Sequence, residues 1–143
     1  MSTMSVFLKQ NKIVKENAFF AATTSLCDEM GEPLLWEIKP LTTREEEKIR
    51  DACTKNIPVS GKSGTQNSNL DSNAYLAKLI ASSIVYPDLL DAELQDSYGV
   101  KTPEDLIKEM LDNFAEYMEL VKFIQKFNGF DISMDEKIEE VKN

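Results

Sequence analysis

The sequence predicts a mainly α-helical fold with a small N-terminal β-hairpin (α+β), in one compact domain of about four to five helices. Three observations carry this prediction. The 143 residues are 42% hydrophobic and 29% charged, which is the composition of a single globular domain. Start and stop signals of helices recur along residues 43–128. Residues 18–39 instead show the alternation and the turn that are typical of two paired strands.

The chain is expected to divide into an arm, a domain and a tail. Residues 1–16 form a locally basic arm with no acidic residue before its last position and at most a short helical turn. Residues 17–131 form a single globular domain, since no internal repeat is visible in them. Residues 132–143 form a charged tail that is frayed or loosely helical. The basic residues of the arm are Lys9, Lys12 and Lys15.

The expected β-hairpin spans residues 18–39. Leu34, Trp36 and Ile38 recur at every second position, so they are predicted to share one face of a strand. Gly31 lies in the turn before them and can adopt the positive φ that a tight turn requires. Because an isolated hairpin is barely stable in water, the face with Trp36 must pack on a helix or on another chain.

Helix signals predict five helices. In the first, Thr43 and Glu46 form a capping box, which satisfies two amides at the helix start. The second begins at Asp71 or Ser72 and is apolar nearly all round, so it is expected to be central. The expected helices span about residues 43–55, 72–85, 91–97, 103–111 and 113–128.

The later helices have equally clear boundaries. The third ends at Gly99, a residue type that helices prefer just past their last turn. The fourth has Pro103 at its first position, where the missing amide hydrogen costs nothing, with acids behind it. The fifth stops at Gly129.

Composition removes several classes of function. The chain has no histidine, so the commonest general base and every Ser-His or Cys-His nucleophile are missing. A net charge of −9 disfavours nucleic acid and acidic membrane surfaces as partners. No stretch approaches the ~20 apolar residues of a membrane span, and the start lacks the apolar region of a secretion signal. We therefore expect a cytoplasmic protein that is not an enzyme and uses no cofactor and no metal ion.

The two cysteines, Cys27 and Cys53, belong to no CxxC motif. One alternative is a disulfide between them. The favoured interpretation is two small buried side chains in a reducing cytoplasm.

Residues 58–70 are dominated by turn-forming residue types and are expected to be a loop. Within them, Gly61-Lys62-Ser63 resembles the end of a phosphate-binding P-loop. That motif also requires a glycine where Asn56 stands, a strand before it and a helix directly after it. The acids of residues 88–96 likewise lack the oxygen spacing of a calcium loop. Both segments are interpreted as structural: a flexible loop and a set of helix caps.

The last expected helix is unusually apolar. At 100° per residue, its large apolar side chains cover an arc of roughly 220°, about twice that of an ordinary surface helix. Two elements packed on this helix would account for the width. Alternatively, one edge of the arc faces a partner protein: Phe123 and Phe127, with Phe130 beyond the turn. The arc comprises Phe114, Tyr117, Met118, Leu120, Val121, Phe123, Ile124 and Phe127.

Four segments resemble the tail assembly chaperones of PBSX-like prophages, the XkdN-like family. The likeness extends over about residues 17–131, and its most specific part is Asp91-Ala-Glu-Leu-Gln-Asp-Ser-Tyr-Gly99. Leu94 and Tyr98 of this part are therefore added as candidate contact residues for a partner. The four segments are residues 34–46, 75–78, 87–99 and 127–131.

The resemblance implies a non-structural phage protein of tail morphogenesis with no catalytic residues. Its implied partners are the tape measure protein, which such a chaperone keeps soluble, and the tail tube protein, which assembles around the tape measure protein. Self-association is a further expected contact. In that family a Pro-Gly or similar break often separates the last two helices. Here only Asp112 or Asn113 offers a cap, so these helices are expected to run closer to continuous.

Two other functions compete with a chaperone. A structural tail completion or connector subunit would remain in the virion. An acidic mimic of DNA is disfavoured, because lysines are mixed among the acids along each helix instead of leaving one uniform face.

Overall fold

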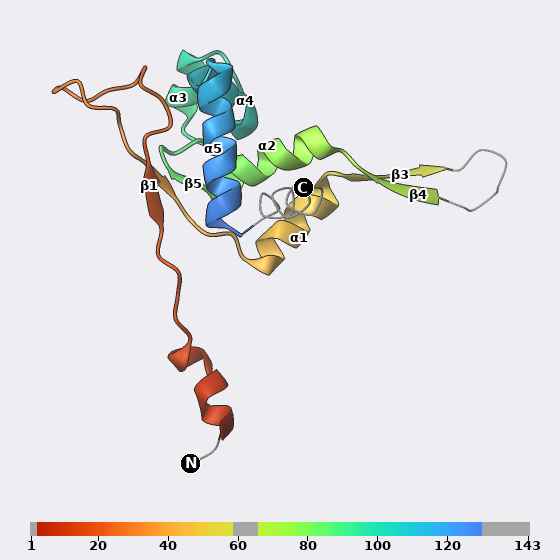
Figure 1. Ribbon diagram of the computed structural model, residues 1–143. Helices are drawn as coiled ribbons and strands as arrows, with labels where there is room; N and C mark the ends of the chain where they lie inside the picture. The colour runs from red at the N-terminus through yellow and green to blue at the C-terminus, as the bar shows by residue number, and fades with distance from the viewer. Residues whose placement is uncertain (1–2, 59–65, 130–143) are drawn as a thin grey trace, which may run out of the picture.

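The computed structural model describes residues 3–58 and 66–129 (Figure 1). In this part of the chain, five α-helices and a three-stranded antiparallel sheet form one body. Two pieces project from the body: a two-stranded hairpin and the N-terminal arm, which ends far from the helices. The predicted fold class, mainly α with a small N-terminal hairpin, is confirmed.

The sheet contains β1 (Ala18–Phe20), β2 (Trp36–Ile38) and β5 (Ile84–Tyr86), in the order β1-β2-β5. The pairing of β1 with β2 confirms the predicted N-terminal hairpin, and Gly31 in its connection has a φ of 81°. The third strand was not predicted. The helix expected over residues 72–85 ends at Ser83, and the next three residues pair with β2 instead.

The five helices are α1 (Thr43–Ala52), α2 (Ser72–Ser83), α3 (Ala92–Ser97), α4 (Pro103–Met110) and α5 (Phe114–Phe127). The side chain of Asp71 caps α2 by accepting from the amide of Ala74. As the sequence predicts, Gly99 and Gly129 follow α3 and α5 with positive φ angles. Helix α2 contacts α1, α4, α5 and β5, which confirms its central position.

The first helix begins at Thr43 as predicted, but its capping box and its C-terminal end differ from the prediction. Its capping box is formed by Thr42 and Glu45, one residue earlier than expected, because Thr42 has the extended backbone that an N-cap needs. The helix ends at Ala52 rather than near residue 55. The chain then enters β3 (Thr54–Pro58), which pairs with β4 (Gln66–Leu70).

The prediction of a loop over residues 58–70 is therefore wrong for β4, which is a strand. Residues such as Asn67 and Asn69 are polar, so this strand lacks the alternation of apolar and polar residues by which a strand is predicted. The Gly61-Lys62-Ser63 segment lies outside the described residues.

Two further expectations are wrong. Helices α4 and α5 are not continuous, because Leu111 leaves the helical region (φ −110°, ψ 62°) and Asn113 begins a new helix by capping it. Both cysteines are free thiols; Cys53 is buried as expected, whereas Cys27 is exposed.

The core lies between one face of the sheet and helices α2, α4 and α5. Trp36 and Ile38 of β2 are 2% and 0% exposed, so the hairpin packs this face on the helices, as its marginal stability requires. The helices contribute several fully or nearly fully buried side chains to this core: Ile80, Leu106, Ile107, Met110, Leu120, Val121 and Ile124.

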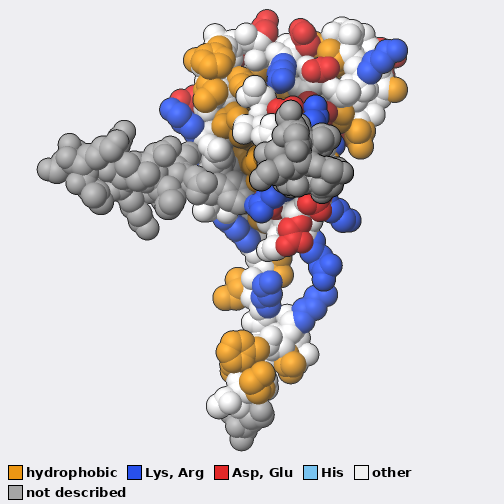
Figure 2. Space-filling view, turned by 90° about the vertical axis from the view of Figure 1, so that its right-hand side faces the viewer, with side chains coloured by type: hydrophobic (Ala, Val, Ile, Leu, Met, Phe, Trp, Pro, Cys, Tyr) orange, Lys and Arg blue, Asp and Glu red, His pale blue; other side chains and the backbone are white. Residues whose placement is uncertain are grey.

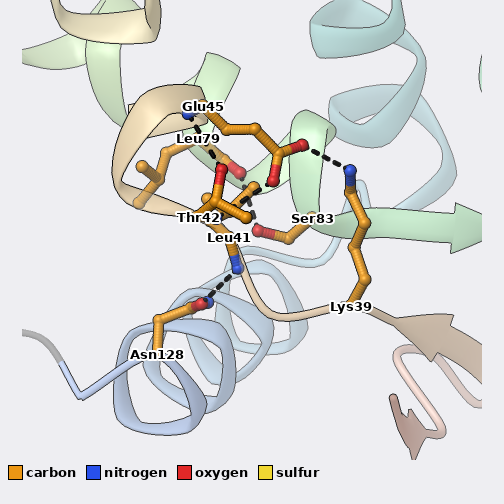
Figure 3. A network of polar contacts seen from close by, with 7 residues as sticks. All are labelled: Lys39, Leu41, Thr42, Glu45, Leu79, Ser83 and Asn128. Atoms are coloured by element: carbon orange, nitrogen blue, oxygen red, sulfur yellow. Dashed lines mark hydrogen bonds and ion pairs between the residues drawn. The ribbon is translucent and has the colours of Figure 1, made fainter. Parts of the chain in front are cut away.

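A polar network fixes the connection between β2 and α1 (Figure 3). The Asn128 side chain, at the end of α5, accepts from the amide of Leu41 at 2.7 Å. The Lys39 ammonium lies 2.6 Å from the Glu45 carboxylate, and this contact, with the Thr42 amide, lowers the pKa of Glu45. The connection is thereby tied to the C-terminal end of α5.

Candidate partner-binding surfaces

The aromatic row of α5 is partly covered by the N-terminal segment. The ring of Phe123 stacks on Phe20 of β1 with centroids 4.4 Å apart, and on Phe127 with centroids 6.1 Å apart. The Lys15 ammonium lies 4.2 Å from the centroid of the Phe127 ring, within the range of a cation–π contact, and donates to the Phe127 carbonyl. Phe123 and Phe127 are consequently half-buried.

The other sequence-derived candidates are also only partly accessible. Leu94 and Tyr98 of α3 are half-buried and pack against the core. Phe130 lies outside the described residues. At the start of α5, Phe114 is 75% exposed, so the wide apolar arc of this helix is covered at one end and open at the other.

A carboxylate also holds the N-terminal segment on α5. Glu116 accepts from the Thr23 hydroxyl at 2.8 Å and from the Thr24 amide at 2.9 Å. The Thr24 amide, followed by the Thr23 hydroxyl, lowers the pKa of Glu116 from its ordinary value of 4.5. Since Thr23 is 2% exposed, the contact reaches into the packed layer between the segment and the helix.

The contact of the Glu116 carboxylate should make the stability of the fold depend on pH. Because the folded state lowers its pKa, Glu116 stabilises the fold above its ordinary pKa of 4.5, and the contribution is lost as the pH falls through the lowered value. Wild type should therefore lose more stability than Glu116→Gln when urea denaturation is compared at about pH 6 and about pH 3. Equal losses in the two proteins would contradict the assignment.

Removing the two covered rings should destabilise the fold. Phe123→Ser with Phe127→Ser is expected to lower the free energy of unfolding by roughly 3 kcal/mol or more, because two half-buried rings correspond to about one fully buried ring. Phe114→Ser, at the exposed start of the same helix, is the matched control and should change it by less than about 0.5 kcal/mol. Urea denaturation followed by circular dichroism measures both, and equal effects of the two variants would contradict the packing.

On the side opposite the core, the sheet exposes large apolar side chains around the carboxylate of Glu37. Phe19 pairs with Glu37, and Glu37 pairs with Tyr86, so these three side chains form one row across the strands. Leu35 is two residues before Glu37 and belongs to the same face. Phe19, Leu35 and Tyr86 are 60%, 56% and 59% exposed. We call these three residues the outer sheet face.

Sequence reasoning missed the outer sheet face. Phe19 and Leu35 come together within the N-terminal hairpin, whereas Tyr86 joins them only because β5 pairs with β2. The available signal was alternation: if Phe20 and Trp36 face the core, their neighbours Phe19 and Leu35 must face outward.

The N-terminal arm also exposes large apolar side chains, between its lysines (Figure 2). It contains two short 3-10 helices, Thr3–Phe7 and Lys9–Asn11, followed by extended chain. Phe7, Ile13 and Val14 are 78%, 91% and 80% exposed. The sequence had indicated the charge of this arm but not this apolar surface.

A groove of about 530 Å³ lies between the end of α2, β5 and the start of α4. Apolar residues line much of it, including Val85, Leu89 and Leu90, and Leu90 is 74% exposed. The acids at this groove are Asp88 and Glu104, and its bases are Lys39 and Lys78. This volume is within the range of pockets that accept a few side chains or a small molecule.

Residues 3–58 and 66–129 contain no group of three or more potential metal ligands. Within the same ranges, no helix has the length and apolar character needed to cross a membrane.

Comparison with known proteins gives consistent matches over almost the whole chain. Residues 4–142 match the family described as phage XkdN-like tail assembly chaperone protein, TAC. Two proteins of Bacillus subtilis (strain 168) are similar over 98% of this chain and 93% of their own length. The phage-like element PBSX protein XkdN is 25% identical over 140 residues, and YqbN is 24% identical over 140 residues.

The fold has a solved counterpart. The crystal structure of the protein YqbN matches with a TM-score of 0.74 and 21% identity, over 92% of this chain and 99% of that one. At this identity the match establishes the fold alone.

Proposed function

Because the chain belongs to the phage XkdN-like tail assembly chaperone family, we propose that it binds the tape measure protein of its phage. In this role it acts without catalysis, in the bacterial cytoplasm, and keeps the tape measure protein soluble until tail tube subunits assemble around it. It is then absent from the finished tail.

One structural observation carries the proposal, the outer sheet face. Phe19 and Tyr86 stay more than half exposed on hydrogen-bonded strands, and Leu35, directly before β2, is exposed to a similar extent. Exposed aromatic clusters of this kind are typical of protein contact sites, since their burial releases water without a large loss of conformational freedom. A chaperone needs such a surface to shield apolar segments of its client.

Four candidates predicted from the sequence lie in the described residues, and we propose that they form a second, weaker contact on the helical side of the sheet. Leu94, Tyr98, Phe123 and Phe127 are half-buried, so each ring or side chain has only part of its surface available. The contribution of a contact residue depends on how much of its surface becomes desolvated on binding. We therefore expect the outer sheet face to contribute more.

Co-expression tests the function directly. A tape measure protein from the same phage or prophage is expressed alone and together with this chain, and its soluble fraction is measured after lysis. The soluble fraction should rise on co-expression, and the two proteins should co-purify through a tag on either one. An unchanged soluble fraction with no co-purification would contradict the proposal.

A second measurement separates the chaperone from a tail completion or connector subunit. Mass spectrometry of purified phage particles should detect the tape measure protein but not this chain. Stoichiometric presence of the chain in particles would favour the structural subunit.

A further inference from the structure

We propose that the N-terminal arm of one copy docks in the groove beside α4 on a second copy of this chain. The first observation is charge. Residues 1–15 contain three lysines and no acid, so they carry a net charge of +3. Because the total net charge of the chain is −9, the other 128 residues carry −12. The arm is thus basic, and the rest of an identical chain offers the acidic surface that complements it.

The second observation is the direction and exposure of the arm. Before Lys15, which contacts Phe127 of its own α5, the arm points away from its own helices (Figure 1), and Phe7, Ile13 and Val14 remain 78–91% exposed. Large apolar side chains on an ordered segment favour burial at an interface. A second copy can cover them when its body lies beside the projecting arm.

The groove offers matching chemistry for these residues. Val85 and Leu90, which are 43% and 74% exposed, supply apolar surface, and Asp88 and Glu104 lie beside it. Of the two lysines at the groove, Lys39 is paired with Glu45, which reduces its repulsion of a basic segment.

A charge-assisted apolar contact of this kind has two parts. Burial of Phe7, Ile13 and Val14 provides most of the affinity, and the lysines of the arm are attracted by the acidic body of the second copy and orient the arm. In a dimer the contact can be reciprocal, so that the arm of each copy docks in the groove of the other.

Light scattering coupled to size-exclusion chromatography measures the association in the absence of any tape measure protein. The wild-type mass should rise with concentration from 16.2 kDa toward twice that value. An arm variant with Phe7→Ser, Ile13→Ser and Val14→Ser, and a groove variant with Leu90→Arg, should each raise the dissociation constant at least about tenfold.

Matched controls remove equally exposed apolar side chains elsewhere. Met30→Ser with Phe114→Ser is the control for the arm, and Phe114→Arg is the control for the groove, since these residues are 88% and 75% exposed. Both controls should associate like wild type. A wild type that stays at 16.2 kDa at all concentrations, or controls that dissociate as fully as the arm and groove variants, would overturn the proposal.

A mixing experiment tests the pairing of arm and groove. The arm variant keeps an intact groove and the groove variant keeps an intact arm, so a mixed pair retains one of the two contacts. A tagged arm variant should therefore retain the untagged groove variant but not an untagged arm variant. Failure to retain the groove variant would show that arm and groove are not partners. These results leave the tape measure proposal untouched, because that protein is absent from the assay.

Discussion

Trp36→Ala is expected to lower the free energy of unfolding by about 3–5 kcal/mol, the largest effect of a single substitution that we predict. Trp36 is 2% exposed and lies on the inner face of the sheet, opposite Phe20 in the strand register. Its removal leaves a cavity between the sheet and the helices, which the surrounding side chains can fill only in part. Since small domains are stable by about 5–15 kcal/mol, this loss brings the protein close to unfolding.

The neighbouring residue provides the control. Leu35 is 56% exposed on the opposite face of the same segment, so Leu35→Ala should change stability by less than about 0.5 kcal/mol. Urea denaturation followed by circular dichroism measures both variants, because Trp36 is the only tryptophan and its removal eliminates the tryptophan fluorescence. Similar losses of stability for Trp36→Ala and Leu35→Ala would contradict the assignment of Trp36 to the buried face and Leu35 to the exposed face.

Replacing Phe19 and Tyr86 together with serine is expected to disrupt binding of the tape measure protein while the chaperone stays folded. Both side chains are about 60% exposed, and they lie on either side of Glu37 in one cross-strand row. Truncating a central aromatic residue of a protein interface typically costs about 2 kcal/mol or more, so the affinity should fall at least roughly 30-fold.

Pull-down of the tape measure protein by tagged chaperone measures this effect. Met30→Ser is the matched control, because Met30 is 88% exposed in the turn of the N-terminal hairpin and outside the outer sheet face. The control should bind like wild type, and circular dichroism should show both variants folded. If the double variant with Phe19→Ser and Tyr86→Ser binds as tightly as wild type, the tape measure protein contacts another surface of the chaperone.

The helix boundaries could be predicted from sequence because their signals are local. Asp71, Thr102 and Asn113 each cap a helix through a bond to an amide two or three residues away. The capping box of α1 was placed one residue late, because adjacent threonines and consecutive glutamates fit the motif in both registers. Local patterns therefore find a helix but do not always identify its N-cap residue.

The sheet and the contact surfaces could be predicted only in part, because they depend on distant pairs. Ile84, Val85 and Tyr86 continue the apolar pattern of α2, and only their pairing with β2 makes them a strand. For the same reason the sequence indicates an open surface at Phe123, whereas Phe20, which precedes it by roughly a hundred residues, packs against its ring. A helical wheel describes one helix and cannot show what covers it.

The contact of Glu116 with Thr23, which spans 93 positions, has a consequence for folding during synthesis. At about 5–20 residues per second, the ribosome makes the N-terminal hairpin several seconds before α5. During this interval the nascent hairpin has Phe20 and Trp36 without the helix that later covers them. Closing so long a segment of chain is slow compared with forming a helix, so the hairpin is expected to dock last. A protein proposed to protect an aggregation-prone client thus passes through an aggregation-prone stage of its own.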